Sequence, residues 1–293
     1  MPRITARYLE NNFLEAIFYL KQPVEAKVYY QPMPEAPVQP KQNDWNFQWE
    51  NFYDDSLFLF KEWIFPHTLE TFRGKSVVDC GCGGGQHINF VAPFARRIIG
   101  IDLNTTAIAR EHTEQHSIVS FVEGDLASVS LPEQHDVVYC IGVLQHTTNP
   151  DATFANIKKM VASGGRLMIW CYSKEGNWPN WLILEPLKRC FILKLPKRAL
   201  LYLATALTAL LYPVIYTLYL LPLRFLPYYE YFGNWRKLSF GRNRLNVFDK
   251  LNAPITNFIT RVQVERWFNQ AEFSDIFIDQ YKGVSWRASG VKL

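Results

Sequence analysis

Three aspartates that close predicted strands are the residues whose type and spacing could hold a charged ligand. Asp79, Asp102 and Asp125 end the apolar runs SVVD, RIIGID and SFVEGD. Because the carboxyl ends of parallel strands meet at one sheet edge, we expect these acids to lie together there. Four glycines follow Asp79 within six positions, and such a turn lets backbone approach a cofactor at a helix N-terminus. An acid beside that turn would repel a pyrophosphate and suits a ligand that carries positive charge.

The elements that must position these acids alternate along the chain. Apolar, β-branched runs predict strands around Val77–Val78 and at 97–103, 120–125, 135–142 and 166–172, and short final strands at 277–280 and 284–287. Helices are expected at 86–95, 106–115 and 151–161, the second capped by Asn104 or Thr105, and Ser163–Gly165 is expected as a tight turn. This alternation predicts an α/β, Rossmann-like, doubly wound and mostly parallel sheet of about seven strands.

Two motifs carry a resemblance to a known family. VVDCGCGGG resembles the first motif of class I S-adenosylmethionine-dependent methyltransferases, a strand followed by D-x-G-x-G-x-G, and VVYCIGVLQHTTNP is similar to their fourth strand ending in G-V-L-H-H. The C-terminal stretch also resembles the family, with Asp249, Pro254, Trp267 and Phe268 at matching positions. The resemblance implies a methyltransferase that binds S-adenosyl-L-methionine as cofactor and acts on a small-molecule, lipid-like or saccharide-linked acceptor. The alternatives are an NAD(P)-dependent oxidoreductase with a Rossmann domain and a non-catalytic cofactor-binding protein.

The cofactor residues follow from these motifs. We expect Asp79 and the glycine turn (Gly81, Gly83, Gly85, with Gln86) to hold the methionine end. The spacing of Asp102 from the turn favours contact with the ribose hydroxyls, and Leu103 follows it. The resemblance assigns Asp125 and Leu126 to the adenine, and Ile141 and Val143 to the other side of the cofactor.

The loop after the fourth predicted strand holds the candidate catalytic residues. His146 is the candidate general base or substrate contact, and Gln145 replaces the first His of the family's pair. The other interpretation is that His146 hydrogen-bonds a loop carbonyl. Because methyl transfer from a sulfonium is an in-line displacement, positioning alone could drive it without a base.

The N-terminal extension, residues 1–72, is expected to be helical and proline-rich. A helix is predicted over 1–21, and five prolines between 22 and 42 indicate an extended linker. Trp45 and Trp49 are spaced to share a helix face, either as core packing or as a lid over the methionine end. The predicted division continues with a cofactor-binding core at 73–175, an insertion at 176–250 and a C-terminal completion of the sheet at 251–293.

The insertion is apolar and basic. Ala199–Leu223 contains no Asp, Glu, Lys, Arg or His over 25 residues, with Pro213 in its middle. Residues 186–250 hold eleven Lys and Arg against two acids, a net charge of +9. One interpretation is a helical lid buried in protein, and the other is a kinked apolar hairpin that contacts an anionic membrane surface. The basic flanks also suit an acidic substrate or a solvated face. The apolar run argues against a nucleic-acid partner.

Composition favours a globular protein in a reducing compartment. The chain has 293 residues, 48% of them hydrophobic, and five cysteines without a disulfide-framework spacing. The first ten residues lack the apolar core of a signal peptide, so we expect a cytoplasmic protein, with peripheral contact at the inner membrane face as an option. Cys80 and Cys82 lack partners for a zinc site, and no metal is expected.

Overall fold

The computed structural model describes residues 43–53 and 56–293, so the expected helix over 1–21 and the proline-rich linker lie outside the described residues. The α-helices are α2 (Asn43–Asn51), α3 (Leu57–Trp63), α4 (Gln86–Val91), α5 (Thr106–His112), α6 (Pro150–Ile157), α7 (Glu185–Cys190), α8 (Lys197–Ile215), α9 (Tyr229–Trp235), α10 (Phe240–Asn252) and α11 (Arg261–Trp267). The strands are β1 (Ser76–Cys80), β2 (Arg97–Asp102), β3 (Val119–Glu123), β4 (His135–Ile141), β5 (Val161–Tyr172), β6 (Phe273–Tyr281) and β7 (Ser285–Lys292). Short helical turns are η1 (Leu69–Phe72), η2 (Leu144–His146), η3 (Lys158–Met160), η4 (Asn180–Leu184), η5 (Ile192–Lys194) and η6 (Leu218–Leu220).

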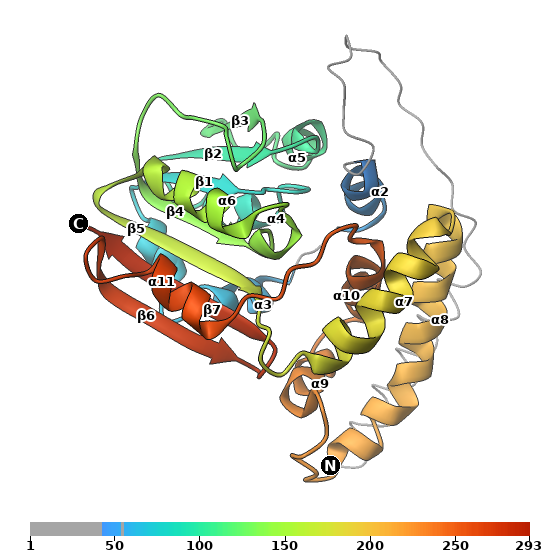
Figure 1. Ribbon diagram of the computed structural model, residues 1–293. Coiled ribbons are helices and arrows are strands. Elements are labelled where there is room, and N and C mark those ends of the chain that lie inside the picture. The colour runs from blue at the N-terminus through green and yellow to red at the C-terminus, as the bar shows by residue number, and fades with distance from the viewer. Residues whose placement is uncertain (1–42, 54–55) are drawn as a thin grey trace. The chain divides into compact units, whose positions relative to one another are not determined.

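The strands form one sheet of seven, in the order β3-β2-β1-β4-β5-β7-β6 (Figure 1). Strands β1 to β5 pair in parallel, and β7 runs antiparallel between β5 and β6. From β1 the chain continues to β2 and β3 on one side and to β4 and β5 on the other, so the switch point of this doubly wound sheet lies at the carboxyl ends of β1 and β4. The predicted Rossmann-like, doubly wound and mostly parallel sheet is confirmed.

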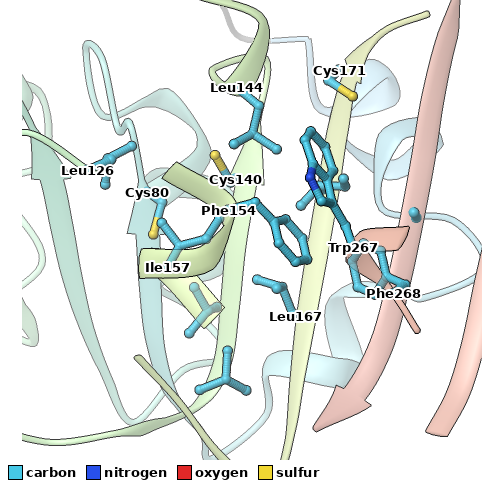
Figure 2. Packing of buried hydrophobic residues seen from close by; sticks show 14 of the residues in the cluster. Cys80, Leu126, Cys140, Leu144, Phe154, Ile157, Leu167, Cys171, Trp267 and Phe268 are labelled. Carbon is cyan, nitrogen blue, oxygen red and sulfur yellow. The ribbon is translucent and has the colours of Figure 1, made fainter. Parts of the chain in front are cut away.

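Helices cover both faces of the sheet, because alternate residues of the central strands point to opposite sides. Val77 lies in the core cluster that includes Phe60 of α3 and Ile88 of α4. Val78 belongs to the other cluster, where Phe154 of α6 stacks on Trp267 of α11 at 4.9 Å between ring centroids (Figure 2). All five residues of β1 are buried, as expected for a central parallel strand.

Several boundaries differ from those predicted. The expected tight turn at Ser163–Gly165 is wrong: β5 begins at Val161 and these residues form an irregularity within it. His135 pairs with Val161 while Val137 pairs with Arg166, so three extra residues on β5 bulge between the two pairs, with Gly164 at φ 73°. Sequence periodicity could not separate this bulge from a turn, since both need glycine. The two C-terminal strands are longer than expected, and α4 ends at Val91 rather than near Ala95.

The contacts divide the chain into two compact units. One comprises 43–186 and 254–293 and contains the sheet, and among the described residues the other comprises 187–253 and is helical. The four-part division made from the sequence stays a prediction.

Within the helical unit, α8 packs against α10. The amide of Asn243 on α10 donates to the Tyr212 hydroxyl at 3.0 Å and to the Trp235 carbonyl at 2.9 Å. Pro213, in the middle of the apolar run 199–223, does not interrupt helix α8. Helix α8 continues from Lys197 through Pro213 and ends at Ile215, two residues after the proline, which has no N–H to donate to the carbonyl four residues earlier.

Candidate functional site

The glycine turn between β1 and α4 is closed in on two sides. Gly81 has φ +85°, and a Cβ there would lie 2.3 Å from Cγ2 of Val143, in the loop after β4. Gly83 has φ +53°, and a Cβ there would lie 2.8 Å from Cε2 of Trp49 on α2. Only glycine fits these two positions, for reasons of both conformation and space. The turn therefore lies between an N-terminal helix and the carboxyl end of β4.

Three side chains hold the backbone of this turn. Gly83 N donates to Asp102 Oδ2 at 2.9 Å, and the Thr105 hydroxyl donates to Gly83 O at 2.8 Å. Nδ1 of His112 donates to Gly84 O at 2.9 Å. Thr105, one of the two predicted caps, is the N-cap residue of α5, but its side chain makes no cap hydrogen bond because its hydroxyl donates to Gly83 O instead. Sequence reasoning missed Thr105 and His112 as supports, since tertiary contact alone pairs them with the glycines.

Asp79 is a buried acid with an oxygen that lacks a partner. Its side chain is 1% exposed, and within the described part of the chain Oδ2 accepts no hydrogen bond. Burial raises the pKa of Asp79 to about 8; the negative charge of Asp102 adds to the rise and the neighbouring Tyr139 hydroxyl opposes it. The amide oxygen of Gln86, at the start of α4, is likewise buried and unsatisfied among the described residues. A buried carboxylate oxygen or amide oxygen without a partner suits a positively charged hydrogen-bond donor.

The other two acids lie at the ends of β2 and β3. Asp102 Oδ1 accepts from Leu103 N at 2.8 Å, so both of its oxygens already hold backbone and fix the carboxylate. Asp125 is exposed, and its Oδ1 accepts from Ala127 N at 2.8 Å. Gly124 N donates to Asp102 O at 2.9 Å, which places the turn that carries Asp125 beside the end of β2. Contacts with ribose and adenine stay predictions.

The residues predicted to contact the adenine ring and the opposite side of the cofactor include buried core residues. Leu126 is buried in the cluster beneath α6, and its carbonyl accepts from Asn156 Nδ2 at 3.0 Å. Ile141, the last residue of β4, is 5% exposed, and Val143 lies against Gly81. The structure therefore brings Asp79, the glycine turn, Asp102 and Val143 to one edge of the sheet.

The candidate catalytic residues lie in η2, directly after β4. Gln145 is 1% exposed, and its side-chain oxygen has no hydrogen-bond partner among the residues described. His146 Nδ1 lies 2.9 Å from the carbonyl oxygen of Ile255, so the hydrogen bond to a loop carbonyl is present. A catalytic role for either residue stays a prediction.

Helix α2 contacts both the glycine turn and the loop that carries His146. Trp49 lies on Gly83, and the ring of Trp45, one turn earlier, lies 4.9 Å from that of His146. The other side of His146 faces Tyr172 at 5.8 Å between centroids, with the rings edge to face. The predicted sharing of one helix face by Trp45 and Trp49 thus takes both indoles to the candidate site, and a lid function stays a hypothesis.

Two cysteines, Cys80 and Cys82, lie beside the turn. Cys80 and Cys82 are buried, and desolvation raises the pKa of both thiols well above the usual value. The described ranges contain no group of three His, Cys, Asp or Glu side chains able to hold a metal ion.

Comparison with known proteins agrees with this geometry. Residues 78–169 match the family described as "Methyltransferase domain". A ubiquinone biosynthesis O-methyltransferase of Paraburkholderia phytofirmans is 33% identical over 111 residues, covering 36% of this chain and 46% of that protein. One of Pseudomonas putida is 29% identical over 132 residues, covering 43% of this chain and 55% of the relative. The chain thus matches about half the length of these relatives.

Among solved structures, the N-methyltransferase NodS of Bradyrhizobium japonicum, in complex with S-adenosylhomocysteine, is similar at 20% identity. The similarity covers 49% of this chain and 78% of that one, with a TM-score of 0.42. Residues 78–169 are thus similar to a methyltransferase domain, and the sheet that contains them has a Rossmann-like, doubly wound order.

Proposed function

We propose that this protein transfers a methyl group from S-adenosylmethionine to an oxygen atom of a small molecule. The observation that carries the proposal is the buried, unsatisfied Asp79 oxygen beside a glycine turn held by Asp102 and walled by Val143 and Trp49. An acidic, glycine-lined site suits a ligand with an ammonium and a sulfonium. It does not suit the pyrophosphate of a dinucleotide, so the oxidoreductase alternative is not favoured.

In this proposal, different residues at the carboxyl edge of the parallel strands hold different parts of the cofactor. Asp79, Gly81, Gly83, Gly85 and Gln86 hold the methionine end, Asp102 and Leu103 the ribose, and Asp125 and Leu126 the adenine, with Ile141 and Val143 opposite. When bound, S-adenosylmethionine supplies an electrophilic methyl group. His146 would accept the proton that an acceptor hydroxyl loses, and Gln145 would line the same loop. The names of the relatives support an oxygen as the acceptor atom.

A ligand competition tests the cofactor. S-adenosylhomocysteine should raise the melting temperature of the full chain, and NAD should not. Asp102→Asn should weaken S-adenosylhomocysteine binding at least tenfold, because Asp102 orients the turn through Gly83. The matched control is Asp136→Asn: Asp136 accepts from Ser76 N at 2.7 Å, but at the opposite end of β1. Equal loss of affinity in both variants, or stabilisation by NAD alone, would overturn the assignment.

We further propose that the acceptor is lipid-like and that the helical unit contacts an anionic membrane surface. Large apolar side chains are exposed along 187–225: Leu187, Phe191, Leu195, Tyr202, Leu210, Val214, Leu218, Leu220, Leu221 and Phe225. Basic side chains exposed in the same stretch are Arg189, Lys194, Arg198 and Arg224, whereas Lys188 is buried and takes no part. An apolar face flanked by cations matches the chemistry of an anionic lipid surface.

Helix α8 contributes Tyr202, Leu210 and Val214 to these exposed apolar side chains. Its buried side carries Thr205 and Thr208, whose hydroxyls donate to the carbonyls four residues earlier, so even these polar groups add no exposed polarity. In the described ranges, α8 alone is long and apolar enough to cross a membrane by length and composition. Core helices of soluble proteins, which are mostly buried, pass the same test; 39% of the apolar stretch of α8 is buried. We therefore favour peripheral contact at the cytoplasmic membrane face over a crossing.

Vesicle binding tests this surface. The full chain should sediment with vesicles that contain phosphatidylglycerol, less so at high salt because exposed charges are screened. Leu210→Asp with Phe225→Asp should abolish sedimentation, since these side chains are 69% and 81% exposed. Val262→Asp is the matched control, a side chain 73% exposed on α11 in the other unit. The membrane proposal is refuted if the control has the same effect, or if the double variant instead dissolves a self-associated form.

Transfer of a radiolabelled methyl group tests the acceptor class. Fractionated lipid extracts should accept label from S-adenosylmethionine in the presence of the full chain, and water-soluble fractions should not. Label confined to sugars or water-soluble metabolites would exclude a lipid-like acceptor while leaving methyl transfer intact. Cofactor binding without label in any fraction would favour the non-catalytic alternative.

A further inference from the structure

A short C-terminal segment is hydrogen-bonded to the loop that carries His146. Asn257 N donates to Gln145 O at 2.7 Å. The side-chain amide Nδ2 of Asn257 donates to Gln145 O at 3.2 Å and to Thr147 O at 2.8 Å. One asparagine therefore holds the backbone on both sides of His146. A side chain that bridges two carbonyls in this way restrains the loop in a single conformation.

The same segment also contacts the imidazole of His146. Nδ1 lies 2.9 Å from Ile255 O, and a carbonyl oxygen can only accept, so Nδ1 must carry a hydrogen. In the neutral ring this leaves the basic lone pair on Nε2. Trp45 and Tyr172 contact the ring at 4.9 and 5.8 Å between centroids and restrict its rotation. The orientation and the tautomer of His146 are thus both set from outside its own loop.

We propose that Asn257 is a positioning residue for methyl transfer: it holds Ile255 against His146 so that the ring keeps its proton on Nδ1 and presents Nε2 as the base. This inference rests on the proposed function of His146. Asn257 follows Ala253, the last residue of the helical unit, by four positions. Asn257 and the loop that it holds both belong to the unit that contains the sheet.

Nitrogen-15 NMR of the histidine rings tests the tautomer without any need for turnover. In the full-length protein, the neutral His146 ring should show a protonated Nδ1 and an unprotonated Nε2, with its signals assigned by their loss in His146→Gln. Asn257→Ala keeps the backbone bond to Gln145 and loses both side-chain bonds, so His146 should shift towards the Nε2–H form. Asn257→Ser, which keeps a hydroxyl donor, should be intermediate and provides a second variant if the alanine form does not fold.

Asn156→Ala is the matched control. Asn156 Nδ2 also bridges two carbonyls, those of Leu126 at 3.0 Å and Val129 at 2.7 Å. Its loss removes the same kind of clamp from another loop and should leave the His146 signals unchanged. If the His146 signals are the same in wild type and Asn257→Ala, or change equally in Asn156→Ala, the positioning role is wrong.

Kinetics then link the positioning to the reaction. Asn257→Ala should lower kcat by roughly ten- to a hundredfold, less than the roughly 10²- to 10⁴-fold expected for removal of a general base. It should also displace the acid limb of the pH–rate profile and leave S-adenosylhomocysteine affinity within about twofold, since positioning of a base acts on the reaction step. If Asn257→Ala shifts the His146 ring towards the Nε2–H form as expected, but wild type transfers no methyl group, the proposed function is wrong while the effect of Asn257 on the His146 tautomer still stands. If wild type transfers methyl groups and Asn257→Ala has the same kcat, only the positioning role of Asn257 is refuted.

Discussion

The buried carboxyl of Asp79 predicts that cofactor binding is linked to proton release. In the ligand-free protein the pKa of Asp79 is raised to about 8, mainly because burial penalises the charged form. At pH 7 the group is therefore largely protonated. A ligand ammonium beside it favours the carboxylate, so binding below pH 8 must expel a proton.

The size of the effect follows from this pKa. If the carboxyl is ionised in the complex, the dissociation constant of S-adenosylhomocysteine should rise about 50-fold between pH 8 and pH 6, approaching tenfold per pH unit. Above pH 8 the constant should level off. Asp79→Asn should bind at least about 50-fold more weakly than wild type at pH 8. It should also bind more weakly than wild type at pH 6, because the wild-type complex holds the ionised carboxyl at both pH values and the variant has none.

Isothermal titration calorimetry provides the assay. Measurements at one pH in buffers of different ionisation enthalpy report the number of protons released, which should approach one at pH 6 to 7 for wild type and zero for Asp79→Asn. Titration of the ligand itself is common to both proteins and cancels in the comparison. A wild-type dissociation constant that is flat from pH 6 to 8, or an equal slope in Asp79→Asn, would refute the reasoning.

Raising the pH should strengthen ligand binding through Asp79 but should lower the folding stability of the ligand-free protein. Because the folded pKa of Asp79 is above its unfolded value, stability of the ligand-free protein should fall from about pH 4 towards pH 8, seen as a lower melting temperature, and this loss should be absent in Asp79→Asn. Gly81→Ala should lower both stability and ligand affinity, because its Cβ would meet Val143, and Val143→Ala should partly restore them; Gly164→Ala, with open space around its Cβ, is the control for left-handed strain. Thr105→Val should destabilise the protein by about 1–3 kcal/mol in chemical denaturation and weaken ligand binding, because Gly83 O loses its donor; unchanged binding would contradict the support role.

The sequence by itself determined the architecture and the identity of the site edge. Continuous β-branched runs such as Val77–Val78 indicate a strand that is buried on both faces of a sheet. Because such strands alternate with helices along this chain, the sequence predicts a parallel sheet. An acid and a glycine turn after such a strand then lie at the carboxyl edge whatever the rest of the chain does. These features are local or topological, so the pattern of residues carries them without knowledge of distances.

Only the tertiary structure decided how that edge is held. Thr105 is the N-cap residue that the sequence predicts, but only the structure shows that its hydroxyl donates to Gly83 O. Ser163–Gly165 resembles a turn in sequence but forms a bulge within β5. Asn257 lies more than a hundred positions from the loop that it holds. A hydrogen bond between side chain and distant backbone leaves no periodicity or spacing in the sequence, because its partner is chosen by the packing of elements that fold independently of the bond.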